Sequence, residues 1–243
     1  MLRRVEPKHI GLAGLLMAVT FSLCGCLYLR LNTVRNQLAD FDRYVTVGGE
    51  PDLALTFKRP VLWSEDVETL FKQPPTEQHE DGAVKTCLWV LEKEPGAAAE
   101  KLAAFRFTFT MLFTSNKLSR LVIPREVLQV VPREAALGMI KAMGQARIST
   151  GRRSAATKFP GASAAAGKFV CDTNDVTRLL GAPHRTQPDG PITTWHYRFV
   201  LRPPPNHPAP GMKVLAGFDF QNTDGCLTSA QIEFSGHQVK MKM

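Results

Sequence analysis

Cysteines are the residues of this chain best suited to covalent chemistry, because a thiol can be acylated, oxidised to a disulfide or bound to a metal. The sequence of 243 residues has five, at positions 24, 26, 87, 171 and 226. Cys87 falls inside a predicted strand, so we expect it to be a buried apolar residue. Cys171 precedes a predicted helix and Cys226 follows the last predicted turn of the same module, so a disulfide could join them. Their spacing matches no metal motif, and we predict neither a metal nor another cofactor.

Positive charge is concentrated in one part of the chain. The formal net charge is +8, and residues 127–168 hold seven basic residues and one acidic residue. Several of these cations stand among Ser, Thr, Ala and Gly, a composition that predicts a flexible linker over residues 149–167. An anionic lipid surface would attract them, and the candidate contacts are Arg147, Arg152, Arg153 and Lys158. Because no aromatic residues are interleaved with these cations on a folded face, we predict no binding to nucleic acid.

The sequence has none of the residue arrangements that are typical of enzymes. It lacks His-Glu-x-x-His, the phosphate-binding Walker loop and Gly-x-Ser-x-Gly. The six histidines are dispersed, and His196 alternates with Trp195 and Tyr197 on a predicted strand, where we expect it to face solvent. Without a nucleophile, a base and a group to orient them, we predict that the protein is not an enzyme.

The N-terminal segment predicts export from the cytoplasm. A basic start precedes an apolar run over residues 10–25, as in a secretory signal. The run ends in Leu23-Cys24-Gly25-Cys26, which resembles the lipobox of bacterial lipoproteins. This resemblance implies that residues 1–26 are a lipoprotein-type signal in which Cys26 is acylated after the residues before it are removed. Extended to Leu29, the apolar run is also long enough for an uncleaved membrane anchor. Both interpretations stay open.

Residues 27–50 are predicted to form a helical stem. Apolar residues recur there at a 4-3-4-3-4 spacing, which places them in one stripe along a helix. They are Leu27, Leu31, Val34, Leu38, Phe41 and Val45. Because fewer than three heptads are marginal for an independent coiled coil, the stripe either forms a stem or packs on the next module.

Two stretches, residues 51–126 and 169–243, share a pattern that predicts a duplicated module. Each has a short helix, a loop containing Asp-Gly, and alternating apolar residues that indicate strands, the aromatic one ending at Phe113 or Phe220. The predicted fold class is α+β. It has two repeated modules, each a short helix packed on a three-stranded antiparallel β-meander, joined by a helical and basic connector over residues 127–168.

The second stretch resembles the SmpA/OmlA (BamE) family of outer-membrane lipoproteins. The resemblance rests on Asp175-Val176, Leu179-Leu180-Gly181-x-Pro183, Thr194-Trp195-His-Tyr197, Phe218-x-Phe220 and Gly225-x-Leu227. In its duplication the chain is similar to the tandem β-lactamase inhibitory proteins, which share the small helix-plus-meander unit. The resemblance implies a non-enzymatic lipoprotein that faces the periplasm and supports the assembly of outer-membrane proteins.

Two functions are therefore predicted as alternatives. In the favoured one, an envelope lipoprotein binds a protein partner through its tandem modules, as a scaffold or assembly factor. In the other, a membrane-surface protein binds anionic lipid through the basic connector. If the N-terminus is an uncleaved anchor, the same modules lie in the periplasm on a single-pass inner-membrane protein.

Overall fold

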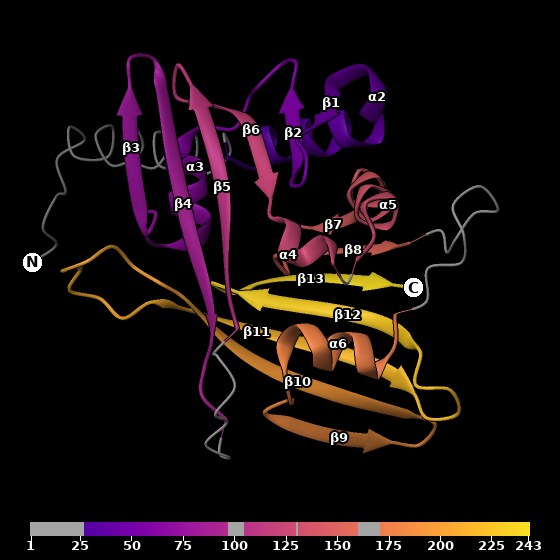
Figure 1. Ribbon diagram of the computed structural model, residues 1–243. Coiled ribbons are helices and arrows are strands. Elements are labelled where there is room, and N and C mark those ends of the chain that lie inside the picture. Colours follow the sequence, from indigo (N-terminus) through magenta and orange to yellow (C-terminus); the bar gives the residue numbers. More distant parts are fainter. Residues whose placement is uncertain (1–26, 97–104, 130, 160–170) are drawn as a thin grey trace, which may run out of the picture.

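A computed structural model describes residues 27–96, 105–129, 131–159 and 171–243. In these ranges thirteen strands form one sheet in the order β1-β2-β6-β5-β4-β10-β11-β12-β13-β8-β7, with β3 paired to β4 and β9 paired to β10. Adjacent strands are antiparallel except β13 and β8, which are parallel. In Figure 1 strands β3 to β5 run up the view and β9 to β13 run across it, so the sheet is strongly twisted.

The first half of the sheet follows from alternating sequences. Cys87 and Trp89 point to the same side of their strand as the facing Met111 and Phe109 of the next strand, and this side forms the core. The strands are β1 (Val45–Gly48), β2 (Leu53–Phe57), β3 (Glu77–Asp81), β4 (Val84–Lys93), β5 (Arg106–Thr114) and β6 (Lys117–Ile123).

The second half has the same alternation. Tyr197 and Phe199 face Ala216 and Val214 across two strands, and all four belong to a second buried cluster. The strands are β7 (Arg147–Ser149), β8 (Ser154–Lys158), β9 (Arg185–Asp189), β10 (Ile192–Leu201), β11 (Met212–Gln221), β12 (Leu227–Phe234) and β13 (His237–Lys242).

Helices cover the apolar side of both halves. Asp66 accepts the backbone N–H of Trp63 and thereby caps one helix, while Asp172 accepts the N–H groups of Asn174 and Asp175 and caps another. The helices are an N-terminal helix described over residues 27–39, α2 (Phe41–Tyr44), α3 (Ser64–Phe71), α4 (Arg125–Leu128), α5 (Arg133–Met143) and α6 (Thr173–Leu180).

The apolar stripe predicted over residues 27–45 packs on the first half. Leu27, Leu31, Val34 and Leu38 contact the first buried cluster, to which Phe41 and Val45 themselves belong. Of the two interpretations of this stripe, packing on the globular part therefore describes the structure.

The two halves meet where the ends of β4 and β10 pair. The pairs are Leu91 with Leu201, Glu92 with Val200, and Lys93 with Phe199. On the core side Leu91 and Leu201 extend the apolar layer, and on the opposite side Glu92 forms ion pairs with arginines 106 and 202. We call this contact the seam.

Residues at the end of α3 in the first half also contact residues of the second half. Phe71 of α3 lies with its ring centre 5.7 Å from that of Trp89 and 5.9 Å from that of Phe234 in the second half. Gln73, buried after the same helix, donates through Nε2 to the carbonyls of Leu201 and Arg202 and accepts the N–H of Met212. The two apolar clusters are therefore held together by α3 as well as by strand pairing.

The predicted fold of two separate helix-on-meander modules is wrong, because one sheet runs through both. Strands β4 and β10 pair with β3 and β9 only over Val84–Leu88 and Ile192–His196. Their remaining backbone groups need hydrogen-bond partners, which each strand finds in the other at the seam.

The predicted connector also differs from the structure. Residues 127–168 were expected to be a helix followed by a flexible basic linker, but β7 and β8 within this range extend the sheet beside β13. The sequence pattern failed here because backbone hydrogen bonds can order Ser- and Ala-rich segments that offer few apolar side chains. Residues 160–167 of the predicted linker lie outside the described residues.

Candidate functional site

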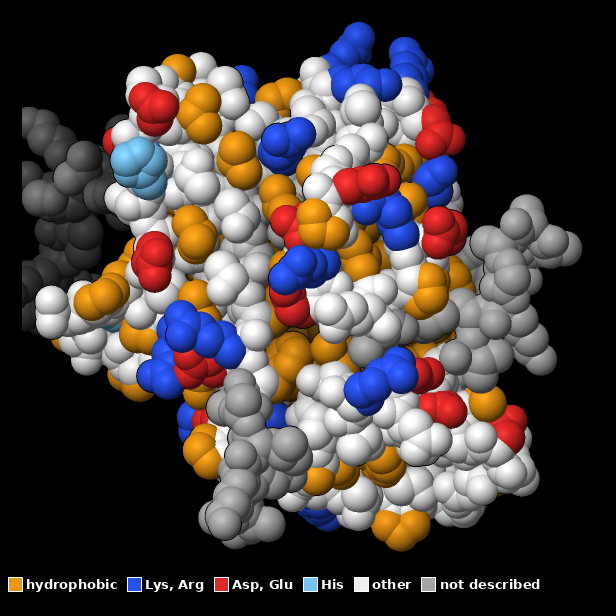
Figure 2. Space-filling model, viewed as in Figure 1, with side chains coloured by type: hydrophobic (Ala, Val, Ile, Leu, Met, Phe, Trp, Pro, Cys, Tyr) orange, Lys and Arg blue, Asp and Glu red, His pale blue; other side chains and the backbone are white. Residues whose placement is uncertain are grey.

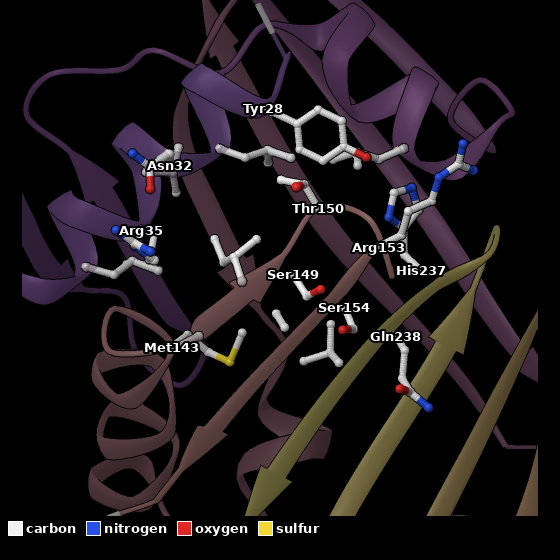
Figure 3. A pocket seen from close by; sticks show the side chains of 18 of the residues that line it. Tyr28, Asn32, Arg35, Met143, Ser149, Thr150, Arg153, Ser154, His237 and Gln238 are labelled. Atoms are coloured by element: carbon white, nitrogen blue, oxygen red, sulfur yellow. The ribbon is translucent and has the colours of Figure 1, made fainter. Parts of the chain in front are cut away.

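An apolar groove lies between the N-terminal helix, the β7–β8 hairpin and the turn from β12 to β13 (Figure 3). Its volume is about 800 Å³, which is within the range of sites for small organic ligands. The apolar lining comprises Leu29, Leu31, Val34, Leu38, Leu70, Met143, Ala146, Ile148, Ala155, Phe234 and Val239.

The register of three strands forms one wall of the groove. Ile148 faces Ala155 across β7 and β8, and Ala155 faces Val239 across β8 and β13. Residues in the same register row point to the same side of a sheet, so these three side chains form an apolar surface. Leu31, Val34 and Leu38 of the N-terminal helix line the opposite wall, so part of the groove is formed by residues whose sequence spacing predicted a buried face.

One end of the groove, its mouth, is cationic. Figure 3 shows Arg153 and His237 at the end near Tyr28, with Met143 at the other end. The N–H of Arg153 donates to Thr150 at 3.2 Å, and its carbonyl accepts the N–H of Gln238 at 3.0 Å. These backbone hydrogen bonds fix the turn against the start of β13, and the side chain of Arg153 lies near that of His237.

Burial lowers the pKa of His237, and the nearby positive charges of Arg153 and Lys72 lower it further. Arg35 of the N-terminal helix also lines the groove. Among the described residues that line it, none is Asp or Glu. A cationic mouth on an apolar groove can bind a molecule with an acidic head and an apolar chain.

The four basic residues predicted as one lipid-binding group are separated by the sheet. Arg152 and Arg153 are both exposed in the same turn, but only Arg153 lines the groove. Arg147 is one residue from Ile148 on β7 and Lys158 is three residues from Ala155 on β8. Because both spacings are odd, these cations point to the opposite side of the same strands.

On that opposite side, Arg147 and Lys158 meet two lysines that sequence reasoning missed. Lys158 faces Lys242, and Ala156 faces both Arg147 and Lys240. A shallow hollow of about 370 Å³ is lined by all four cations. The available signal was the alternation Lys240-Met241-Lys242, which predicts two cations on one side of a strand. We call these four residues the basic patch.

The positions of the three described cysteines indicate how reactive each thiol is and whether two of them can form a disulfide. Cys87 is fully buried, and burial raises its pKa to about 11. Cys171 is a buried free thiol whose pKa is raised to about 12 by burial and by the charges of Asp175 and Asp172. Cys226 and Asp172 form an isolated antiparallel β-bridge, and the backbone N–H of Leu227 donates to the carbonyl of Cys171. Since this register directs Cys171 and Cys226 to opposite sides, it does not favour the disulfide that the sequence allowed.

His196 was expected to face solvent, but it is half-buried on the side of the sheet away from α6. It lines a hollow of about 620 Å³ with Thr194, Asp219 and Glu233, and its Nε2 is buried without a hydrogen-bond partner.

Across the residues that the structure describes, no cluster of three His, Cys, Asp or Glu could hold a metal ion. On the face seen in Figure 2, basic side chains are interspersed with acidic and uncharged ones.

Cys26, the predicted acylation site, lies outside the described residues. No helix within the described ranges combines the length and apolar composition needed to cross a membrane. Searches with this chain match no family model, no curated protein and no solved structure, so the resemblance to the SmpA/OmlA (BamE) family stays a prediction.

Proposed function

We propose that the protein binds a single-chain anionic amphiphile, such as a fatty acid or a lysophospholipid, with its chain in the groove and its head at the cationic mouth. The observation that carries this proposal is an apolar groove of about 800 Å³ that is lined, among the described residues, by Arg35, Arg153 and His237 but by no Asp or Glu. The proposal includes the predicted envelope location, because a protein exported with an N-terminal lipid or anchor would meet such ligands at the membrane.

The groove walls supply the apolar part of the binding. Ile148, Ala155 and Val239 on one side and the leucines of the N-terminal helix on the other would remove a methylene chain from water. Each buried methylene contributes about 0.8 kcal/mol, so a chain of several carbons binds without any specific polar contact. The chain would run from the mouth toward Met143.

The mouth supplies selectivity for an acid. The guanidinium of Arg153 can hold two oxygens of a carboxylate or phosphate, and His237 becomes a second cationic donor when it is protonated. An anion at this position would relieve the repulsion among Arg153, His237 and Lys72. A neutral ligand with the same chain would gain only the apolar contacts.

Displacement of a long-chain fluorescent fatty acid from the purified protein tests the proposal. Ala155→Phe fills the groove and should weaken binding about tenfold or more, which corresponds to about 1.4 kcal/mol. Ala156→Phe is the matched control, because the neighbouring residue on the same strand points to the opposite side and should leave the affinity unchanged.

A second pair of variants tests the head. Arg153→Gln should weaken the binding of the fatty acid about tenfold without affecting its methyl ester, since a hydrogen bond to a charged group contributes about 1.5–3 kcal/mol. Arg152→Gln, in the same turn but outside the groove lining, should have no effect. Equal losses in the groove variant and its control, or no binding by the wild type, would exclude this function and favour the predicted protein partner.

A further inference from the structure

We infer that the basic patch of Arg147, Lys158, Lys240 and Lys242 is a docking surface for an anionic lipid bilayer. The patch and the groove lie on opposite sides of β7, β8 and β13. The inference therefore goes beyond the ligand groove, because a chain docked through the patch keeps the groove open on the other side.

The packing of like charges is the first argument. Lys158 and Lys242 are direct partners on parallel strands, and Arg147 and Lys240 flank the same Ala156. Like charges at such positions destabilise a sheet. The lining of the hollow has no Asp or Glu among the described residues. Lys240 also borders the neighbouring hollow that contains Asp219 and Glu233, and its Nζ lies 3.9 Å from Asp219. An external array of anions is the partner that would neutralise this surface.

The shape of the patch favours a bilayer over other polyanions. β7 ends the strand order, so the patch lies at an edge of the sheet and is open to a flat surface. Its described lining residues include no aromatic side chain on which nucleobases could stack. Lysines have flexible apolar stems and ammonium groups that suit lipid headgroups in a plane, and each contributes about fivefold to the affinity for an anionic surface.

Sedimentation of the full chain with vesicles tests the inference. The probes are phosphatidylcholine vesicles with and without phosphatidylglycerol, and the measured quantity is the ratio of the two affinities. This ratio removes the contribution of the N-terminal apolar run, which does not depend on lipid charge. The basic residues before that run are the same in every variant, so a comparison between variants removes their contribution. We expect the ratio to exceed one at low salt and to approach one at high salt.

Matched variants locate the surface. Lys158→Gln with Lys242→Gln should lower the ratio about tenfold or more. Lys117→Gln with Arg120→Gln removes the same charge from β6, which is separated from β13 by five strands, and should leave the ratio nearly unchanged. All four side chains are exposed or half-buried, so the melting temperatures should agree.

Three outcomes would overturn the inference. The first is a ratio of one for the wild type at low salt, and the second is an equal loss in the two double variants, which would indicate net charge alone. The groove variant Ala155→Phe should bind vesicles like the wild type. The third outcome is its failure to do so, which would mean that the vesicle signal comes from lipid taken into the groove.

Discussion

Arg30 and Asp66 join the N-terminal helix to α3 through two parallel contacts. Nε and Nη2 of Arg30 lie 2.6 and 2.5 Å from the two carboxylate oxygens of Asp66. The same carboxylate accepts the N–H of Trp63 at 2.9 Å and caps α3. One buried acid therefore both starts a core helix and fixes the helix that forms a wall of the groove.

Arg30→Gln should destabilise the protein by about 2–4 kcal/mol, because it leaves a buried carboxylate without its cation. Arg178→Gln is the matched control. Asp175 has the same capping position in α6, but its partner Arg178 is on its own helix and mostly exposed. We expect the control to cost less than about 1 kcal/mol. Chemical denaturation measures both values, and similar losses would show that Arg30 contributes no more than a surface ion pair.

His237 should make stability depend on pH. Its lowered folded pKa means that the unfolded chain binds the proton more readily. Stability from this group is therefore fully present above the unfolded pKa near 6.5 and declines as the pH falls toward the folded pKa. Urea unfolding across this window should show a smaller decline for His237→Gln than for the wild type, and equal declines would contradict this role of His237.

The same histidine should give ligand binding the opposite dependence. A bound anion favours the protonated ring, so the affinity for a fatty acid headgroup should rise as the pH falls through the same window. Titration with a ligand that stays ionised, such as an alkyl sulfate, isolates this effect from protonation of the ligand. An affinity of the wild type that does not change with pH would contradict the placement of the head at the mouth.

The thiols of Cys87 and Cys171 should not react in the folded protein. Burial raises both pKa values, to about 11 and about 12, so little thiolate exists at mildly alkaline pH. Peptide mapping after iodoacetamide treatment should find both unmodified without denaturant and both modified with it. Rapid native labelling of either residue would contradict its burial.

Gln73→Leu should weaken the seam. The substitution keeps a side chain of similar size but removes hydrogen bonds to the backbone of Leu201, Arg202 and Met212, which should cost about 2–4 kcal/mol. Gln78→Leu on the exposed strand β3 is the control and should cost much less. Differential scanning calorimetry would compare them, and equal melting temperatures would contradict a role for Gln73 across the seam.

Local order was predictable from the sequence where side chains determine it. The stripe from Leu27 to Val45 and the alternation in β4 and β10 each mark a buried side, and these sides are buried. The joining of β4 to β10 was not predictable, because backbone pairing between distant strand ends has no side-chain signature. For the same reason the hairpin of β7 and β8 was interpreted as a linker.

The candidate site shows the same division. Arg147, Arg153 and Lys158 were identified by their charge, but their separation onto two sides of the sheet depends on strand register, which the composition of the segment does not contain. Lys240 and Lys242 were missed because their partners on β8 come from much earlier in the chain. His237 was missed for a similar reason, since its neighbour Arg153 lies in the turn before β8. A site assembled by a parallel strand pair brings together residues that no local window connects.

The position of β13 determines when the last part of the sheet can assemble during synthesis. This strand lies between β12 and β8, although β8 is made long before it. While a ribosome is still making the segment that follows β8, the β7–β8 hairpin has no neighbour within the sheet and exposes the apolar row that begins with Ile148. A nascent chain therefore has neither the groove nor the basic patch until Lys242 has left the exit tunnel. An export pathway that carries unfolded chains would deliver this protein before either surface exists.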